Sequence, residues 1–283
     1  MKKFSLSVLL ESVLLVLLCA NAFADTAIGT YMEVEHCNEF VSLRYSNSTS
    51  SELLARVPLG ERVVCLADLG EFCYVGTQYG RGYIRSEYLE ASDDDMTGRI
   101  PAFVPYSEIS LFLSNFTEAD FAWKKGCFNL GDNADMIEFA INHIWFNQRE
   151  KLVWHDGSDE YNVSVDDSYI PSIVKRFFNV EPIDLEPLWV DYDGYSYKWY
   201  ETGGHVKDGF AMLTAIYDIG NGYYKIWFET YGWGENWDNS VFALSMDEVR
   251  NRYAQGSNGY AMIHADDLSD SDTYYLVRYA LNI

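Results

Sequence analysis

A cysteine followed by two histidines could provide a nucleophile and its base. Cys127 lies in the segment Lys-Gly-Cys-Phe-Asn, ahead of an expected helix, and His143 and His155 follow it in the sequence. A thiol near a helix N-terminus can have a lowered pKa, and a histidine can then act as the base. Spacing alone does not bring these side chains together, so a buried or incidental thiol is the favoured interpretation.

An aromatic loop in the C-terminal half could support a different chemistry. Residues 231–238 read Tyr-Gly-Trp-Gly-Glu-Asn-Trp-Asp, which places Trp233 and Trp237 among glycines and polar residues. Such tryptophans suit stacking on sugar faces or anchoring a protein interface. Glu235 could pair with a second carboxylate for glycoside hydrolysis, but 43 acidic residues make such a pairing uninformative. A loop folded back over its sheet is the structural alternative.

Other catalytic and metal-binding patterns do not occur in the sequence. The five histidines have no ligand spacing, and there is no His-Glu-x-x-His, Cys-x-x-Cys, Gly-rich phosphate loop or Gly-x-Ser-x-Gly. Acidic stretches such as Asp266–Asp272 lack the spacing of a complete calcium loop and are interpreted as solvated turns. The sequence therefore predicts no metal site and no cofactor.

The N-terminus has the pattern of a cleaved signal peptide spanning residues 1–24. Lys2-Lys3 is followed by a short apolar run, and Ala22-Phe-Ala24 is a small-x-small cleavage site. The apolar run is too short for a membrane anchor, and no later segment is long enough to span a bilayer. Attachment of lipid at Cys19 is disfavoured because the bulky Leu18 precedes it. The protein is expected to be secreted or associated with the cell wall.

The chain is acidic in both of its halves. Residues 25–97 contain 13 acidic and 5 basic side chains, a net charge of −8, and residues 98–283 contain 29 and 13, a net charge of −16. Nucleic-acid binding needs Lys and Arg to displace counterions, so the charge disfavours a nucleic-acid partner. It also disfavours electrostatic adhesion to anionic lipid or to an anionic wall polymer.

Four cysteines would remain after removal of the signal peptide. Cys65 and Cys73 are symmetric about Leu69, in the middle of an expected hairpin. Symmetric positions on paired strands allow a disulfide only at a suitable register. A Cys65–Cys73 disulfide is favoured, with Cys37 as a competing partner for either, and small buried thiols are the alternative. Cys127 is expected to be free.

Residues 35–90 have the pattern of a compact all-β module. Short segments of strand-forming residues are separated by a polar loop at Asn47–Ser51 and by turns at Pro58–Gly60 and Gly80–Gly82. Five short strands in about sixty residues favour a small barrel over an open sheet. The expected strands are Phe40–Arg44, Leu53–Val57, Arg62–Leu66, Phe72–Thr77 and Gly82–Ile84.

Three segments of this module resemble bacterial SH3-like (SH3b) domains. They are Val41-Ser-Leu-Arg44, Pro58-Leu-Gly-Glu61 and Gly82-Tyr-Ile-Arg-Ser-Glu-Tyr-Leu89, which occur in order and at fitting distances. The resemblance covers about a quarter of the chain and implies an SH3-like barrel over residues 25–92. It further implies association with the cell wall and binding of peptidoglycan peptides. This copy departs from the pattern in its three cysteines and in Phe72-Cys73, where a Trp or Tyr pair is expected.

Exposed aromatic residues are the expected ligand-binding groups of this module. Tyr45, Tyr79 and Tyr83 could line a peptide groove, although Tyr83 also suits closure of the barrel core. Arg44 is expected to pair with an acidic neighbour rather than with a ligand.

The second region, residues 100–283, follows a charged linker at 93–99 and is expected to be an α+β domain. Its pattern places helices at Ala134–Lys151 and Tyr169–Phe178 first, and then an antiparallel meander of about five strands. A curved sheet wrapped on a helix, as in cystatin-like or NTF2-like folds, would fit this order by architecture alone. The expected strands are Tyr195–Tyr200, Ala211–Asp218, Tyr223–Tyr231, Tyr260–Ala265 and Thr273–Ala280.

These features predict an exported, non-enzymatic protein that binds peptidoglycan through its SH3b module and a protein or glycan through its C-terminal domain. Two alternatives stay open. One is a cell-wall hydrolase that uses Cys127 and His143 or a carboxylate near Glu235. The other is a cystatin-like inhibitor or regulator of a wall hydrolase, whose acidic surface meets a basic enzyme.

Overall fold

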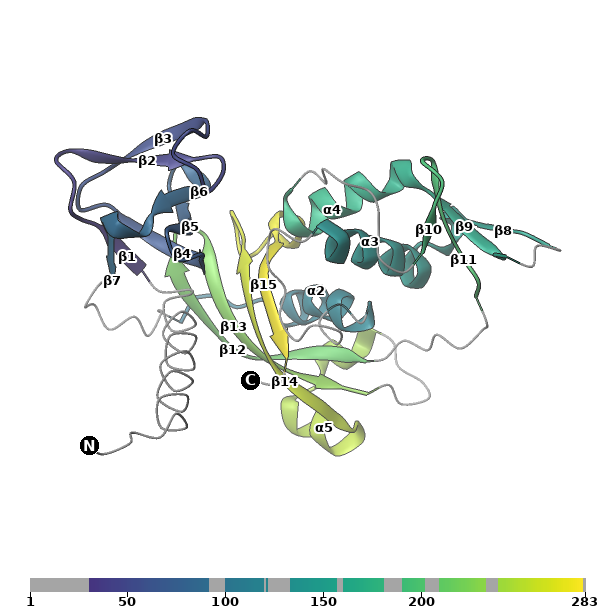
Figure 1. The fold of residues 1–283 in the computed structure, drawn as a ribbon. Helices are drawn as coiled ribbons and strands as arrows, with labels where there is room; N and C mark the ends of the chain where they lie inside the picture. The colour runs from purple at the N-terminus through teal and green to yellow at the C-terminus, as the bar shows by residue number, and fades with distance from the viewer. Residues whose placement is uncertain are drawn as a thin grey trace, which may run out of the picture. The chain divides into compact units, whose positions relative to one another are not determined.

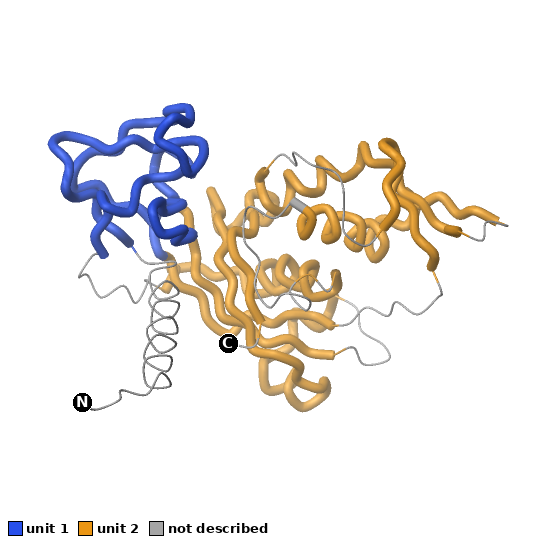
Figure 2. The backbone as a smooth tube through the Cα atoms, in the orientation of Figure 1, with its two compact units in different colours: residues 1–98, 219–221 blue, residues 99–218, 222–283 orange. Residues whose placement is uncertain are grey.

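The computed structural model describes residues 31–91, 100–119, 121, 133–156, 160–180, 190–201, 209–232 and 239–281. The chain divides into two compact units (Figure 2): residues 1–98 with 219–221, and residues 99–218 with 222–283. The fold is mixed α/β with several antiparallel sheets. Among the described residues, none of the helices is long and apolar enough to cross a membrane.

The N-terminal unit is built on one antiparallel sheet of seven strands, in the order β3-β2-β6-β5-β4-β1-β7 (Figure 1). All five strands expected from the sequence are present, and two short strands that pair with each other, β1 and β7, are additional. The strands are β1 (Tyr31–Val34), β2 (Phe40–Arg44), β3 (Leu53–Pro58), β4 (Arg62–Asp68), β5 (Phe72–Thr77), β6 (Gly80–Arg85) and β7 (Leu89–Ala91), with a 3-10 turn η1 (Ser86–Tyr88) before β7.

Side-chain alternation gives this unit its core. On β2, Val41 and Leu43 are buried while their neighbours are more exposed, as expected for a strand with one face on the core. Val57, Val75 and Ile84 join them in a single apolar cluster. Identification of this unit as an SH3-like barrel stays a prediction.

The described residues of the C-terminal unit form two four-stranded sheets, in the orders β10-β11-β9-β8 and β12-β13-β14-β15. Its helices are α2 (Tyr106–Glu118), α3 (Asn133–Asn147), α4 (Ile170–Phe178) and α5 (Met246–Arg252). Its strands are β8 (Leu152–Trp154), β9 (Val163–Asp166), β10 (Asp191–Tyr192), β11 (Ser196–Trp199), β12 (Phe210–Gly220), β13 (Tyr223–Tyr231), β14 (Gln255–His264) and β15 (Tyr275–Leu281). Helices α2, α3 and α4 share one core with strands from both sheets.

The structure corrects the expected order of helices followed by one meander. Strands β8 and β9 lie between α3 and α4 in the sequence, and the strand expected at Tyr195–Tyr200 is β11, which pairs with β9 and β10. The C-terminal meander therefore has four strands rather than five. Strands β8 and β10 have three and two residues, and β9 is buried at three of its four positions, so none of them has a sustained alternating pattern that would indicate a strand.

Helix ends also differ from the expectation in one place. Helix α3 ends at Asn147, and a separate 3-10 turn occupies Arg149–Lys151, within the span expected as one helix. Helix α5 begins with a capping box: the Ser245 hydroxyl accepts a hydrogen bond from Glu248 N, and the Glu248 carboxylate accepts one from Ser245 N. The hairpin turn between β12 and β13 has positive φ angles of 85°, 53° and 77° at Gly220, Asn221 and Gly222, which glycine and asparagine adopt readily.

Two buried serines join helix α2 to β12, the first strand of its sheet. Ala211 N donates to Ser114 Oγ at 2.9 Å, and Leu213 N donates to Ser110 Oγ at 3.0 Å. The Ser114 hydroxyl in turn donates to Ser110 O at 2.7 Å. The helix thus satisfies two backbone amides of a strand that has a sheet neighbour on one side only.

Candidate functional site

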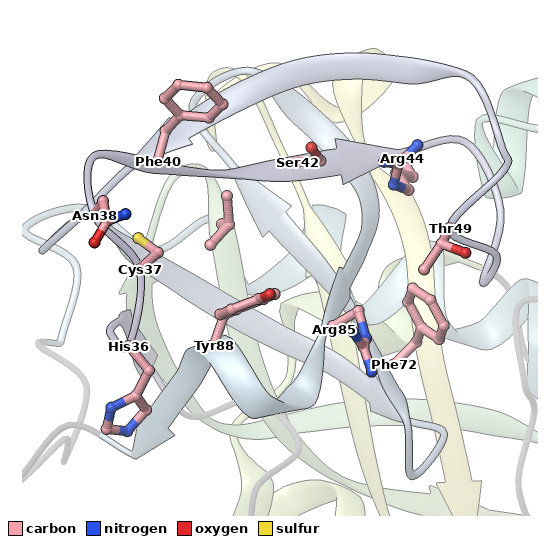
Figure 3. Close-up of a pocket in the computed structure, with 11 residues that line it drawn as sticks. His36, Cys37, Asn38, Phe40, Ser42, Arg44, Thr49, Phe72, Arg85 and Tyr88 are labelled. Atoms are coloured by element: carbon pink, nitrogen blue, oxygen red, sulfur yellow. The ribbon is translucent and has the colours of Figure 1, made fainter.

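A pocket of about 430 Å³ lies in the N-terminal unit and is the candidate functional site (Figure 3). It is formed by residues from several separate segments that the sheet brings together. The lining residues are His36, Cys37, Asn38, Phe40, Val41, Ser42, Arg44, Thr49, Phe72, Arg85 and Tyr88.

The elements that hold these residues are short and well defined. Residues 36–38 connect β1 to β2, residues 40–44 form β2 itself, and Thr49 lies in the loop to β3. Phe72 begins β5, and residues 85–88 cover the end of β6 and the turn η1. Because β2 pairs with both β3 and β6, the sheet fixes β2 opposite the segment that carries Arg85 and Tyr88.

The segment before β2 holds one residue in a strained conformation. His36 has a φ of 56°, in the left-handed region that non-glycine residues adopt rarely and at a cost. Its Nε2 lies 2.6 Å from Glu90 Oε1 on β7, and the preceding Glu35 N donates to Tyr88 O at 2.9 Å. These contacts fix the wall of the pocket that contains Cys37 and Asn38.

The lining residues are distributed unequally around the pocket. Figure 3 shows His36, Cys37 and Asn38 at one end and Arg44, Thr49, Phe72 and Arg85 at the other, with Tyr88 between them and its hydroxyl directed toward the Arg85 end. The second end is therefore rich in hydrogen-bond donors, and Phe72 and the Tyr88 ring provide apolar surface beside them.

Arg44 reaches this end from strand β2. Its Nη1 donates to Ser51 O at 2.7 Å, which fixes the orientation of the guanidinium group. The structure pairs it with no carboxylate among residues 31–91, contrary to the expectation of an acidic partner. A guanidinium group has five N–H donors, so most of its donors are available to another acceptor.

Arg85 contributes the second guanidinium group at the same end. Its Nη1 lies 2.7 Å from Glu87 Oε1 and its Nη2 lies 3.5 Å from Glu71 Oε1, and both glutamate side chains are more than half exposed. Its Nε is buried without a hydrogen-bond partner. Exposed ion pairs are weak, so Arg85 can exchange these partners for a ligand at little cost.

The charge of the pocket is opposite to that of the chain. The chain has 43 acidic and 20 basic residues, yet the eleven lining residues include two arginines and no aspartate or glutamate. The sequence could not show this, because the lining residues are separated by up to some fifty positions and their neighbours include glutamates.

The three tyrosines expected to bind a ligand lie outside this pocket. Tyr45 and Tyr79 are 63% and 48% exposed, and Tyr83 is half-buried against Tyr74, with ring centroids 4.8 Å apart. Burial, and to a lesser extent the nearby Tyr45, raises the pKa of Tyr83. A binding role for these tyrosines stays a prediction.

Cys65 and Cys73 lie close together in the core of the N-terminal unit. Their Sγ atoms are 3.3 Å apart, and both side chains are buried. A register shift between Cys65 and Ala67 places Cys73 opposite Asp68, so the two cysteines are diagonal neighbours rather than a directly opposed pair. Cys37 is half-buried and lines the pocket instead. The disulfide stays a prediction.

The expected catalytic residues are only partly described by the structure. His143 is buried on α3, where its ring stacks on Phe139 at 5.8 Å and its Nδ1 lies 3.3 Å from Asn147 Nδ2. This is the environment of a core histidine. The other expected residues, which are Cys127, Glu235, Trp233 and Trp237, lie outside the described residues.

His155, the second histidine that follows Cys127 in the sequence, makes a polar contact within the C-terminal unit. Its Nε2 lies 2.8 Å from Ser164 Oγ on β9, and its ring packs against Tyr161 at 5.1 Å. Within the described ranges, no group of three or more His, Cys, Asp or Glu residues has the arrangement of a metal site.

Comparisons with known proteins add no functional assignment. No model of a known protein family matches the chain, and no curated protein matches it. Two solved structures are similar: NlpC2 from Trichomonas vaginalis, with a TM-score of 0.20 and 10% identity over 81% of this chain and 71% of that chain, and NlpC1 from the same organism, with a TM-score of 0.20 and 11% identity over 66% and 60%. Similarities at this TM-score carry no argument about fold or function.

Proposed function

We propose that this chain is an exported, non-enzymatic protein of the cell wall, whose N-terminal unit binds peptidoglycan through the pocket described above. The proposal assigns binding of a protein or a glycan to the C-terminal unit. The N-terminal sequence pattern of a signal peptide supports export.

One observation carries the proposal for the N-terminal unit. Two of the three segments that resemble SH3b domains supply five of the residues that line the pocket: Val41, Ser42 and Arg44 from the first, and Arg85 and Tyr88 from the third. The resemblance and the cavity, which are independent observations, therefore point to the same place in the unit. Concave sites with a few polar groups beside aromatic surface are typical of ligand-binding pockets.

The proposal is tested by sedimentation of the mature protein with purified, insoluble peptidoglycan. A Thr49→Trp substitution adds an indole at the pocket, on an exposed loop where it disturbs no core packing. Ser50→Trp is the matched control, because Ser50 is exposed in the same loop and does not line the pocket.

We expect the unmodified protein and Ser50→Trp to pellet with the wall, and Thr49→Trp to remain largely in the supernatant. Equal pelleting of both variants would contradict binding of peptidoglycan through the pocket. Absence of pelleting by the unmodified protein would contradict wall binding itself.

A further inference from the structure

The pocket has two guanidinium groups at one end, and they suggest a more specific ligand. Arg44 and Arg85 lie at this end with Thr49, and no carboxylate of the described residues lines it. Planar guanidinium groups bind carboxylates through two parallel hydrogen bonds, which makes the contact both strong and directional.

We propose that this end of the pocket recognises a free carboxylate of a peptide, with Arg44 as the principal contact and Arg85 as the second. The inference rests on the proposed function, because it names the chemical group of peptidoglycan that the pocket selects. Peptidoglycan peptides have such carboxylates, whereas the glycan strands offer mainly hydroxyl and amide groups.

The hydrogen bonds of the two arginines explain their different roles. Arg44 is oriented by Ser51 O and has no carboxylate partner among the described residues, so its charge is fully available to a ligand. Arg85 shares its charge with Glu71 and Glu87, but its buried Nε has no acceptor. A ligand carboxylate at this end would give Arg44 a charged acceptor, and Arg85 can exchange its exposed glutamate partners for it.

The remaining lining residues fit the rest of a peptide. Phe40, Phe72 and Tyr88 provide apolar surface for aliphatic side chains. Asn38 at the opposite end has both a donor and an acceptor for a peptide bond. The pocket therefore combines a site for one charged group with a neutral extension.

The test compares insoluble peptidoglycan with the same material after its carboxylates have been converted to amides by carbodiimide and ammonia. A mock treatment without carbodiimide is the control for handling. Amidation removes negative charge from the wall, so long-range electrostatics alone would strengthen the binding of an acidic protein. Recognition of a carboxylate predicts the opposite result, which is weaker binding to the amidated peptidoglycan.

We expect the mature protein to bind amidated peptidoglycan at least about tenfold more weakly than mock-treated peptidoglycan. Hydrogen bonds to charged groups contribute strongly to the free energy of binding. Arg44→Gln should bind both materials with the same low affinity, and Arg85→Gln should show a smaller difference between them. Arg62→Gln is the matched control, because it removes the same charge from an exposed position outside the pocket and should retain the full difference.

The outcomes separate this inference from the function on which it rests. Equal binding to both materials would overturn the recognition of a carboxylate and leave wall binding intact. Loss of binding after removal of wall phosphate polymers, but not after amidation, would assign the arginines to a phosphate and also overturn it. Failure to bind either material would contradict the proposed function.

Discussion

At the scale of single residues, Cys65 and Cys73 are the pair whose chemistry the structure defines most closely. Their Sγ atoms are 3.3 Å apart, and the register shift in β4 places both side chains in the core. Cys37 packs against the same cluster from the side of the pocket. The geometry thus favours Cys65–Cys73 over a link to Cys37.

The mature protein treated with a small-molecule disulfide should form the Cys65–Cys73 bond. The two thiols lose two protons and two electrons, and the reagent is reduced to two thiols. We expect the free energy of unfolding to rise by roughly 2 kcal/mol relative to the reduced protein, because the bond constrains the unfolded chain. Non-reducing peptide mapping and urea unfolding measure these effects. Cys37→Ser should still form the bond, and a mapped link to Cys37 would contradict the prediction.

Asp193 provides a prediction about pH. A hydrogen bond from Lys198 Nζ at 2.5 Å and backbone hydrogen bonds from Ser196 and Tyr195 lower the pKa of Asp193 from 3.8 to about 2. A carboxyl with a lowered pKa in the folded state stabilises the protein above its unfolded pKa of about 4. This contribution is lost as the pH falls from about 4 through about 2.

Titration of the Asp193 carboxyl followed by NMR should give a midpoint near 2. In Lys198→Met, the midpoint should move back toward 3.8, because the largest cause of the shift has been removed. The pH dependence of unfolding between about 2 and 4 should also become smaller. An unchanged midpoint in the variant would show that the backbone hydrogen bonds alone hold the carboxyl.

At the scale of elements, the contact of helix α2 with β12 shows how the C-terminal unit closes one side of its sheet. Ser110 and Ser114 accept hydrogen bonds from the amides of Leu213 and Ala211, and both serines are 1% exposed. A buried amide without an acceptor is costly, so these two hydroxyls stabilise the sheet more than exposed serines would.

Ser114→Ala should lower the free energy of unfolding by about 1–3 kcal/mol, because it leaves the amide of Ala211 buried without a partner. Ser172→Ala, on the exposed side of α4, is the control and should change it by no more than about 0.5 kcal/mol. Urea unfolding of the two variants beside the unmodified protein provides the measurement. Equal changes in the free energy of unfolding for the two variants would show that water replaces the Ser114 hydroxyl as the partner of the Ala211 amide.

The elements that could be predicted from the sequence are those with enough residues to show a period. Strands β2, β5 and β13 match their expected bounds, since each is a run of strand-forming residues with turn residues near its ends. Strands β8 to β10 are too short for such a pattern, and their separate sheet could not be inferred from it. The pocket was missed for a related reason: periodicity indicates the face on which a residue lies, but not which distant loops meet there.

The role of Arg44 illustrates the same limit at the site. Its position in a segment that resembles SH3b domains was visible in the sequence, but an acidic chain offered many apparent partners for it. Only the structure shows that Ser51 O is its hydrogen-bond partner and that carboxylates are absent from the lining of the pocket. Arg85 lies in another segment that resembles SH3b domains, and Phe72 stands where the pattern expects a Trp or Tyr pair, but nothing in the sequence indicated that these residues and Thr49 line one pocket.

At the scale of the whole molecule, the net charge of −23 and the two arginines of the pocket would have opposite effects on the proposed wall binding. Most of the charges that would repel the chain from an anionic wall lie farther from it than a Debye length, which is about 8 Å at physiological ionic strength. Salt therefore screens this repulsion effectively. The contacts in the pocket are shorter than a Debye length and are screened less. Added salt should therefore remove the repulsion before it weakens the contacts.

We expect sedimentation with peptidoglycan to increase as salt rises from about 0.02 M to about 0.15 M, and to decrease only at much higher concentrations. Arg44→Gln should show the increase from a lower starting value. A steady decrease with salt from the lowest concentration would indicate binding by long-range attraction and contradict the prediction. The same measurement with a basic wall-binding protein gives the reference behaviour.

The hydrogen bonds between α2 and β12 also constrain the order in which the molecule can fold. They join residues that are 97 and 103 positions apart, so helix α2 cannot complete its contacts until the chain has reached β12. The strand pairs of the N-terminal unit, by contrast, lie within residues 31–91. Closing such long loops slows folding. A chain synthesised from its N-terminus would therefore acquire its N-terminal unit early, while the contacts of α2 with β12 form only after the last third of the sequence is available.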